Sequence, residues 1–157
     1  MIKIGILGSS GRVGSLLIDD LKNDTEAKVS CVHVFDKIEK VLPPDTVVTN
    51  DINVLFEQSD VIIDFSSPVA TEELLTAVVE GGKRKPLVIA TTGLSKHQQN
   101  LLLEASKLVP ILYATNMSLG VAVLNKLVAL ASKALRDFDI EIVDKEEEFS
   151  ENFSVVF

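Results

Sequence analysis

The sequence predicts a doubly wound α/β domain, in which helices cover both faces of a parallel sheet. Short apolar runs recur along the chain, and most are separated by stretches of ten or more residues with helical periodicity. The runs are almost continuously apolar, as expected for parallel strands that are buried on both faces. Because no internal repeat is present, the pattern indicates successive βαβ units in one sheet.

The first elements are a buried strand over residues 1–7 and a helix that follows a glycine-rich turn at residues 8–11. Apolar residues at i, i+3 and i+4 spacing predict that this helix ends near Leu21. Residues 28–35 are apolar and β-branched, which predicts a second strand. A third, short strand is expected at residues 47–48, after a proline-rich loop.

Capping residues indicate where the next helices begin. Asp51 is positioned to cap a short helix that ends at Gln58, and the apolar run 61–65 predicts the strand after it. Ser67 and the proline that follows it predict the cap and first turn of another helix, which Gly81–Gly82 terminates. Ser95 and Gln98 have the spacing of a capping box and predict a helix to residue 108. The remaining predicted elements are strands at 87–90, 111–115 and 140–143 and a helix at 118–135.

Composition limits the class of protein. The 157 residues are 46% hydrophobic and 24% charged. This length and hydrophobic content are enough for one domain with a hydrophobic core. The net charge of −8 argues against nucleic acid or an anionic membrane as a partner. Cys31 is the only cysteine, which excludes an intrachain disulfide. Gly5 and Gly8 interrupt the first apolar run, and the long apolar stretch 119–135 contains lysines, so we expect a cytoplasmic protein without a membrane span.

The end of the chain differs from the rest. Residues 144–157 carry a net charge of −4, half of the total, and show no clear apolar period before residue 153. The simplest interpretation is a solvated acidic segment. We therefore expect a main domain at residues 1–138 and a separate short region at residues 139–157.

The strongest local motif is Gly8-Ser-Ser-Gly-Arg-Val-Gly14, between the first strand and the first helix. Glycine at position 8 permits a tight turn, Gly11 lets backbone N–H groups approach a pyrophosphate, and Gly14 permits close packing of the helix. The helix N-terminus directs its partial positive charge at the phosphates. The pattern is typical of a Rossmann-type dinucleotide site, although a glycine turn that serves packing alone is the alternative.

An acidic residue strengthens this interpretation. Asp36 lies 22 residues after Gly14, at the end of the second predicted strand, where a carboxylate can accept hydrogen bonds from the adenosine ribose. Lys37 could instead contact a 2′-phosphate, so the pair leaves NADH and NADPH both open. Two solvated loop charges are the alternative.

Three later strand ends carry hydroxyl or amide residues with apolar neighbours. These segments are Phe65–Ser66, Thr91–Gly93 and Asn116–Met117. Ligands of open α/β sheets bind beyond the carboxyl ends of the strands, and these residue types suit a nicotinamide ring with its carboxamide. Taken singly, each segment is better explained by turn chemistry or helix capping.

Other candidate residues are not expected to form a catalytic or metal-binding site. His97 lies in the first turn of a predicted helix and is expected to face solvent, while Cys31 and His33 lack further ligands for a metal. Tyr113 is not followed by a lysine four residues later, so the catalytic pair of short-chain dehydrogenases is absent. We predict no catalytic residue and no metal ligand in this chain.

Four segments follow one another in residues 1–144: Gly8-Ser-Ser-Gly-Arg-Val-Gly14, Val61-Ile-Ile-Asp-Phe-Ser-Ser-Pro68, Val88-Ile-Ala-Thr-Thr-Gly-Leu94 and Tyr113-Ala-Thr-Asn-Met-Ser-Leu-Gly120. In this order they resemble the motifs of the dihydrodipicolinate reductase (4-hydroxy-tetrahydrodipicolinate reductase) family of bacterial diaminopimelate and lysine biosynthesis.

The resemblance implies an oxidoreductase that moves a hydride from NADH or NADPH to a cyclic unsaturated dicarboxylate. It assigns the pyrophosphate to residues 8–13, the adenosine ribose to residues 36–37, the nicotinamide side to residues 65–66 and 90–92, and the junction with substrate and a second domain to residues 114–117. The implied cofactor-binding residues are Gly8, Ser9, Ser10, Gly11, Arg12, Val13, Asp36, Lys37, Phe65, Ser66, Ala90, Thr91, Thr92, Ala114, Thr115, Asn116 and Met117.

The sequence also departs from the family pattern. Ala90 stands where the family usually has glycine. After residue 144 the family has paired histidines, a lysine and a Ser-Gly-Thr loop, whereas this chain reads Lys145-Glu-Glu-Glu-Phe-Ser-Glu-Asn152. Acids at these positions would repel a dianionic substrate. The resemblance implies that residues 1–138 are the dinucleotide-binding domain and that residues 139–157 are a remnant of the entry to the substrate domain with an acidic tail. The substrate domain itself and the tetramer that it forms in the family are not expected.

Three hypotheses follow. The first is a truncated reductase that binds NAD(P)H with little or no turnover. The second is a non-catalytic dinucleotide-sensing or interaction module whose acidic end engages a partner. The third is a fragment that binds no cofactor.

Overall fold

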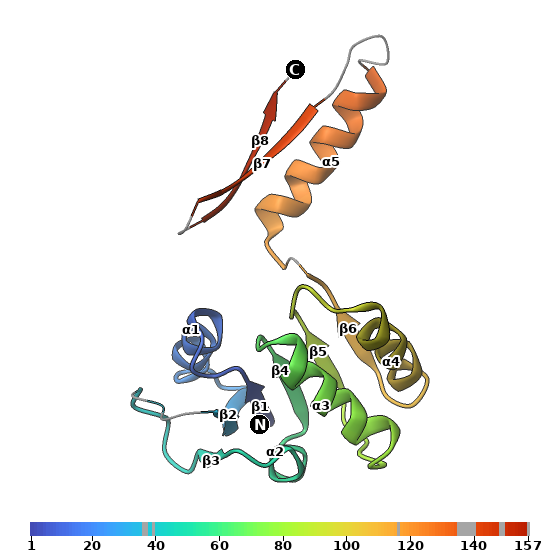
Figure 1. Cartoon of the computed structure of the whole chain (residues 1–157). Coiled ribbons are helices and arrows are strands. Elements are labelled where there is room, and N and C mark those ends of the chain that lie inside the picture. The colour runs from blue at the N-terminus through green and yellow to red at the C-terminus, as the bar shows by residue number, and fades with distance from the viewer. Residues whose placement is uncertain (36–37, 39, 116, 135–140, 148–149, 157) are drawn as a thin grey trace. The chain divides into compact units, whose positions relative to one another are not determined.

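The computed structural model describes residues 1–35, 38, 40–115, 117–134, 141–147 and 150–156 (Figure 1). For Leu119 and residues 141–147 and 150–156 the description covers the backbone only. The chain divides into two compact units, Met1–Thr115 and Asn116–Phe157. The boundary predicted at residues 138–139 lies inside the second unit. The expectation that residues 1–138 and 139–157 have different roles stays a prediction.

The first unit contains a six-stranded sheet in which every pair of neighbouring strands is parallel. The strand order is β3-β2-β1-β4-β5-β6, so the direction in which strands are added reverses between β1 and β4. This order confirms the doubly wound fold, and the crevice at such a reversal is where these sheets bind ligands. The strands are β1 (Ile2–Leu7), β2 (Ala27–His33), β3 (Val47–Thr49), β4 (Val61–Asp64), β5 (Leu87–Ile89) and β6 (Ile111–Tyr113).

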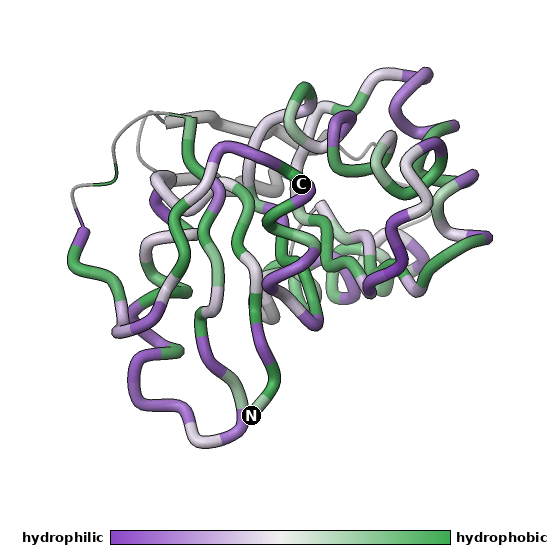
Figure 2. Tube along the Cα trace, turned by 90° about the horizontal axis from the view of Figure 1, so that it is seen from below, coloured by the Kyte–Doolittle hydropathy of each residue, from purple (hydrophilic) through white to green (hydrophobic). Residues whose placement is uncertain are grey.

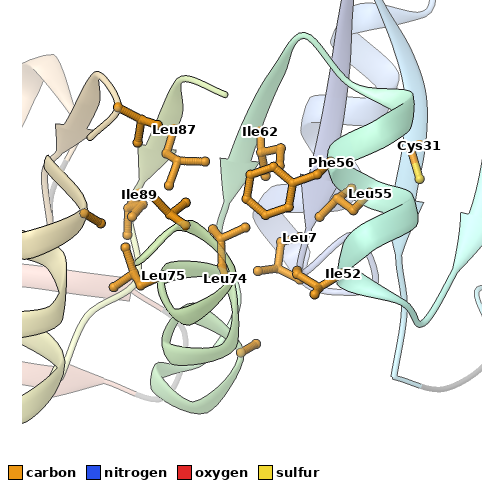
Figure 3. Packing of buried hydrophobic residues seen from close by; sticks show 14 residues of the cluster. Leu7, Cys31, Ile52, Leu55, Phe56, Ile62, Leu74, Leu75, Leu87 and Ile89 are labelled. Carbon is orange, nitrogen blue, oxygen red and sulfur yellow. The ribbon is translucent and has the colours of Figure 1, made fainter. Parts of the chain in front are cut away.

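Two apolar clusters cover the two faces of this sheet. On one face, Ile18 of α1 (Arg12–Leu21) packs against Ile6 and Val32 of the first two strands. On the other face, α2 (Ile52–Gln58), α3 (Pro68–Val79) and α4 (Lys96–Ser106) contribute to one cluster, in which Phe56 of α2 lies beside Leu7 and Ile62 (Figure 3). Burying one aromatic or branched side chain contributes about 1.5–3 kcal/mol. Hydrophobic stretches accordingly follow the strands, while hydrophilic ones gather on the turns around them (Figure 2).

Three helices of the first unit begin where their capping residues predict. Asp51 accepts a hydrogen bond from the Asn53 N–H at the start of α2. Ser67 caps α3, which has a proline in its first turn. Ser95 and Gln98 form a complete capping box at the start of α4, and the Gln98 side chain also donates to the Pro68 carbonyl of α3. The caps thus fix the starts of these helices at the carboxyl edge of the sheet.

Removing the Ser95 hydroxyl tests the capping box. Ser95→Ala leaves the Gln98 N–H without its partner, so we expect the free energy of unfolding to fall by about 1 kcal/mol. Urea unfolding followed by circular dichroism measures this change. Ser106→Ala is the matched control, because the exposed Ser106 hydroxyl bonds only to the Leu103 carbonyl of its own helix. A control loss as large as that of Ser95→Ala would remove the special role of the cap.

The second unit contains α5 (Leu119–Ala134) and a hairpin of β7 (Glu141–Glu147) and β8 (Ser150–Val156). The two strands pair antiparallel, with Glu141 opposite Val156 and Glu147 opposite Ser150. The sequence predicts a strand only at residues 140–143 and a solvated segment after it, so the longer β7 and the whole of β8 were missed. None of the helices in the described part of the chain is long and apolar enough to cross a membrane.

Candidate functional site

The carboxyl ends of the central strands bring several predicted site residues to one edge of the sheet. The Phe65 N–H donates to the Leu7 carbonyl at 3.1 Å, so β4 continues beside β1 up to this residue. The Ala90 N–H donates to the Asp64 carbonyl at 2.9 Å, and the Ala114 N–H donates to the Ile89 carbonyl at 3.1 Å. The segments that begin at Phe65, Ala90 and Ala114 therefore leave the sheet side by side.

The glycine-rich turn lies directly against the end of β4. Gly8 has a φ of +85°, a left-handed conformation that favours glycine. A Cβ atom on Gly8 would lie 2.5 Å from the Phe65 carbonyl oxygen and 2.8 Å from the Ser66 Cα. Both the turn and the close approach thus require glycine, and they join residues 8–11 to the Phe65–Ser66 segment.

The same turn leads into a helix N-terminus that no side chain caps. Gly11 is the N-cap residue of α1, and its N–H donates to the Gly8 carbonyl at 3.1 Å. A Cβ on Gly14 would lie 2.4 Å from that carbonyl oxygen, so the first turn of α1 packs closely against the glycine turn. Free N–H groups at a helix N-terminus carry a partial positive charge and bind anions.

The side chains of the glycine-rich turn have different roles. Ser9 is buried, and its hydroxyl donates to the His33 carbonyl at 2.9 Å, which ties the turn to β2. Ser9 can therefore meet a ligand only through its backbone. Ser10, Arg12 and Val13 are exposed and remain available to one.

The segments after β4 and β5 meet around a buried carboxylate that the sequence interpretation did not single out. Asp64 is the last residue of β4 and is fully buried. Its Oδ1 accepts hydrogen bonds from the Ser66 N–H, the Ser66 hydroxyl and the Thr91 hydroxyl, and its Oδ2 accepts one from the Thr71 hydroxyl. The signal that could have found it is an acid that directly follows three apolar residues of a buried strand. Thr92, unlike Thr91, is exposed.

The loop after β2 is anchored on both sides of its predicted ribose-binding pair. Asp36 and Lys37 lie outside the described residues. Before them, the Val34 N–H donates to the Thr49 carbonyl at 2.9 Å. After them, the Lys40 ammonium donates to the Ser15 hydroxyl at 2.8 Å and to the Asp19 carboxylate at 2.5 Å. Hydrogen bonds lower the pKa of the Asp19 carboxyl; the bond from Lys22 has the largest effect and the bond from Lys40 the next largest.

The fourth predicted segment spans the division between the two units. Ala114 and Thr115 are the last residues of the first unit, and Met117 belongs to the second, where it is exposed. Asn116 lies outside the described residues. The structure therefore brings Ala114 to the strand-end edge and leaves the placement of Asn116 and Met117 near a ligand as a prediction.

His97 and Cys31, which we excluded as chemical groups, have environments that offer no reactive group. His97 is exposed on α4, with its Nε2 atom 3.7 Å from a Glu72 carboxylate oxygen. Burial raises the pKa of the Cys31 thiol to about 11, so this thiol stays protonated and unreactive near neutral pH. In the described part of the chain, no group of three or more histidine, cysteine or acidic side chains is placed to hold a metal ion.

A cavity of about 710 Å³ lies between α2 and α3, away from the glycine turn. Glu72, Glu73 and Glu80 are among its lining residues. Three carboxylates would repel the phosphates of a nucleotide, so the strand-end edge is the better candidate for an anionic cofactor.

Comparison with known proteins finds a matching family model and similar proteins for this chain. Residues 2–117 match the family model described as dihydrodipicolinate reductase, N-terminus. The chain is 78% identical over 145 residues to the 4-hydroxy-tetrahydrodipicolinate reductase of Aliarcobacter butzleri and 58% identical over 144 residues to that of a Nitratiruptor species. Each match covers 92% of this chain and 56% of the relative, so the chain spans little more than half the length of these curated relatives.

A solved structure supports the fold independently. The dipicolinate-bound dihydrodipicolinate reductase from Paenisporosarcina sp. TG-14 aligns with a TM-score of 0.74 at 21% identity. The alignment covers 96% of this chain and 62% of that one.

Proposed function

The chain belongs to the dihydrodipicolinate reductase family, and from this premise we propose that its strand-end edge binds a nicotinamide dinucleotide, NADH or NADPH. The observation that carries the proposal is the glycine turn of residues 8–11, which contacts the Phe65–Ser66 segment and opens into the uncapped N-terminus of α1. When bound, the dinucleotide supplies a hydride at its reduced nicotinamide ring.

The pyrophosphate is assigned to the turn and the first turn of α1. Backbone N–H groups between Gly8 and Val13 donate to the phosphate oxygens, and the dipole of α1 favours the negative charge there. Ser9 contributes through its backbone, because its hydroxyl is bound to the His33 carbonyl. The exposed side chains of Ser10, in the turn, and Arg12, directly after it, supply further donors.

The two ends of the dinucleotide are assigned to opposite sides of this turn. Asp36 or Lys37 meets the adenosine ribose or its 2′-phosphate, as the motif spacing predicts. Phe65, Ser66 and the segment 90–92 line the nicotinamide side, with Thr91 acting through its backbone since its hydroxyl donates to Asp64. The resemblance of the motifs assigns Ala114, Thr115, Asn116 and Met117 to the same end of the dinucleotide, next to the substrate.

The relatives from Aliarcobacter butzleri and Nitratiruptor are 4-hydroxy-tetrahydrodipicolinate reductases. We propose that residues 1–157 carry the cofactor half of that reaction, in which a hydride passes to a cyclic unsaturated dicarboxylate. Holding an acceptor beside the nicotinamide can account for roughly 7–11 kcal/mol of the barrier. The sequence contains no histidine after His97, no Ser-Gly-Thr loop and a net acidic segment at 144–157, so these residues alone lack groups that attract and hold a dianion.

We expect the 157-residue chain to bind NADH or NADPH and to reduce substrate at a small fraction of the rate of a curated relative. Titration with each reduced cofactor, followed by nicotinamide fluorescence, measures binding. The loss of NADPH or NADH absorbance with 4-hydroxy-tetrahydrodipicolinate measures turnover, with the Aliarcobacter butzleri relative as the positive control. A flat trace with both cofactors contradicts the proposed binding site, and turnover near that of the relative contradicts the division of roles.

A further inference from the structure

Asp64 is a buried carboxylate at the point where the cofactor-facing segments begin. It follows three apolar residues of β4 and has no measurable exposed surface. Burying a carboxylate is costly unless hydrogen bonds or an opposite charge replace its hydration. None of the ion pairs between described side chains involves Asp64. Its charge must therefore be satisfied by hydrogen bonds.

Four neutral donors surround this carboxylate. Ser66 supplies two of them, its N–H at 2.9 Å and its hydroxyl at 2.5 Å. The Thr91 hydroxyl donates at 3.1 Å and the Thr71 hydroxyl at 2.6 Å. Hydrogen bonds to a charged acceptor are stronger than those between neutral groups. The cluster therefore holds each donor in one orientation.

The donors come from three different segments of the first unit. Ser66 lies in the turn after β4, Thr91 lies after β5, and Thr71 lies in α3. The Asp64 carbonyl also accepts the Ala90 N–H at 2.9 Å, so one residue contacts the β5 segment through both its backbone and its side chain. Phe65, between Asp64 and Ser66, is the residue against which Gly8 packs. Asp64 thus holds both segments that are predicted to line the nicotinamide side. The glycine turn lies directly against one of them, at Phe65.

We propose that Asp64 is a positioning residue, whose carboxylate holds the Phe65–Ser66 and Ala90–Thr92 segments in the conformation that accepts the nicotinamide end of the dinucleotide. The inference rests on the proposed function. Asp64 is buried, so it acts on the ligand only through the residues that it holds. Loss of its charge should loosen the nicotinamide side while the glycine turn and α1 continue to bind the pyrophosphate.

Asp64→Asn in the full 157-residue chain tests this separation. An amide of the same shape keeps one oxygen for Ser66 and Thr91, and the Thr71 hydroxyl can turn to accept from the new NH₂ group. The fold should survive with weaker bonds. We expect the Kd for NADH to rise by about tenfold, which corresponds to the loss of one charge-assisted hydrogen bond. ADP-ribose has no nicotinamide, so its Kd should change less than about twofold. The fluorescence of NADH bound at saturation should also move toward that of free NADH.

Thr71→Val is the matched control, because it removes a hydrogen bond to the same carboxylate from a residue outside the proposed lining. It should destabilise the fold in urea without changing the NADH to ADP-ribose affinity ratio. If Asp64→Asn does not fold, Thr91→Val replaces it, since it removes only the hydrogen bond between the Asp64 carboxylate and the β5 segment and should change the same ratio. Equal weakening of both ligands, no change in either, or the same ratio in Thr71→Val would overturn the positioning role. Failure of the unaltered chain to bind NADH, NADPH or ADP-ribose would instead overturn the proposed function, and this inference with it.

Discussion

Replacing Gly11 by aspartate is expected to abolish detectable dinucleotide binding while leaving the chain folded. Gly11 is the N-cap residue of α1, with φ of −74° and ψ of 167°, a conformation open to any residue. Aspartate is among the preferred N-cap residues, because its carboxylate accepts the N–H groups of the first helical turn. In this chain those are the groups assigned to the pyrophosphate. The new side chain would thus both occupy the donors and repel the phosphates.

The expected effects on stability and affinity have opposite signs. Relative to glycine, an aspartate cap stabilises a helix by a few tenths of a kcal/mol, and its charge at the helix N-terminus adds about 0.3–1 kcal/mol. The Cβ would lie 3.2 Å from the Gly8 carbonyl oxygen, which requires only a small adjustment. We expect the Kd for NADH to rise at least about a hundredfold, equivalent to about 2.7 kcal/mol.

Gly11→Asn separates the charge from the shape. Asparagine has nearly the same size and also caps helices, but it is neutral. It should weaken binding less than aspartate does, and the difference between the two variants reports the electrostatic repulsion. Nicotinamide fluorescence gives both Kd values, and urea unfolding shows that both variants are folded. Unchanged NADH binding by Gly11→Asp would exclude the N-terminus of α1 from the site.

The fold was predictable because its signals are local and each has a physical mechanism. Ser67, Ser95 and Asp51 mark helix starts through hydrogen bonds to residues two or three positions later, so the sequence alone contains both partners. The parallel sheet follows from apolar strands that are separated by helices. Strand ends were less accurate: β6 ends at Tyr113, whereas the apolar run predicts residue 115.

The direction of individual side chains at the site was not predictable in the same way. Serine and threonine after a strand can face a ligand or the interior, and the choice depends on partners far along the chain. The Ser9 hydroxyl turns to the His33 carbonyl, 24 positions away, and Thr91 turns to Asp64, 27 positions away. The β7–β8 hairpin was missed for a related reason: the charges in residues 144–151 indicate solvent, whereas strand pairing depends on a register that no local pattern contains.

Gly8→Ala is expected to destabilise the fold strongly, because backbone strain and a steric clash add at this position. A non-glycine residue at a φ of +85° is strained by about 1–2 kcal/mol. The added Cβ would also lie 2.5–2.8 Å from backbone atoms of Phe65 and Ser66, which cannot turn away as a flexible side chain could. We therefore expect a loss of about 3 kcal/mol or more in the free energy of unfolding, measured in urea.

Gly82→Ala is the matched control for the backbone strain. Gly82 has a φ of +68°, yet nothing lies within 4 Å of the position of its Cβ. It follows the C-terminal end of α3, on the way back to the amino end of β5, so it is remote from the cofactor edge. This variant should lose only the strain energy, about 1–2 kcal/mol, and should bind NADH as the unaltered chain does.

The difference between the two variants isolates the contact between the glycine turn and β4. If that contact sets the geometry of the pyrophosphate site, Gly8→Ala must lose NADH and ADP-ribose affinity together, because the turn binds the part that the two ligands share. Asp64→Asn is expected to affect NADH alone, since it acts on the nicotinamide side. Equal stability losses for Gly8→Ala and Gly82→Ala would mean that the turn moves away from Phe65 at no cost. The close approach at Gly8 would then not be a requirement of the site.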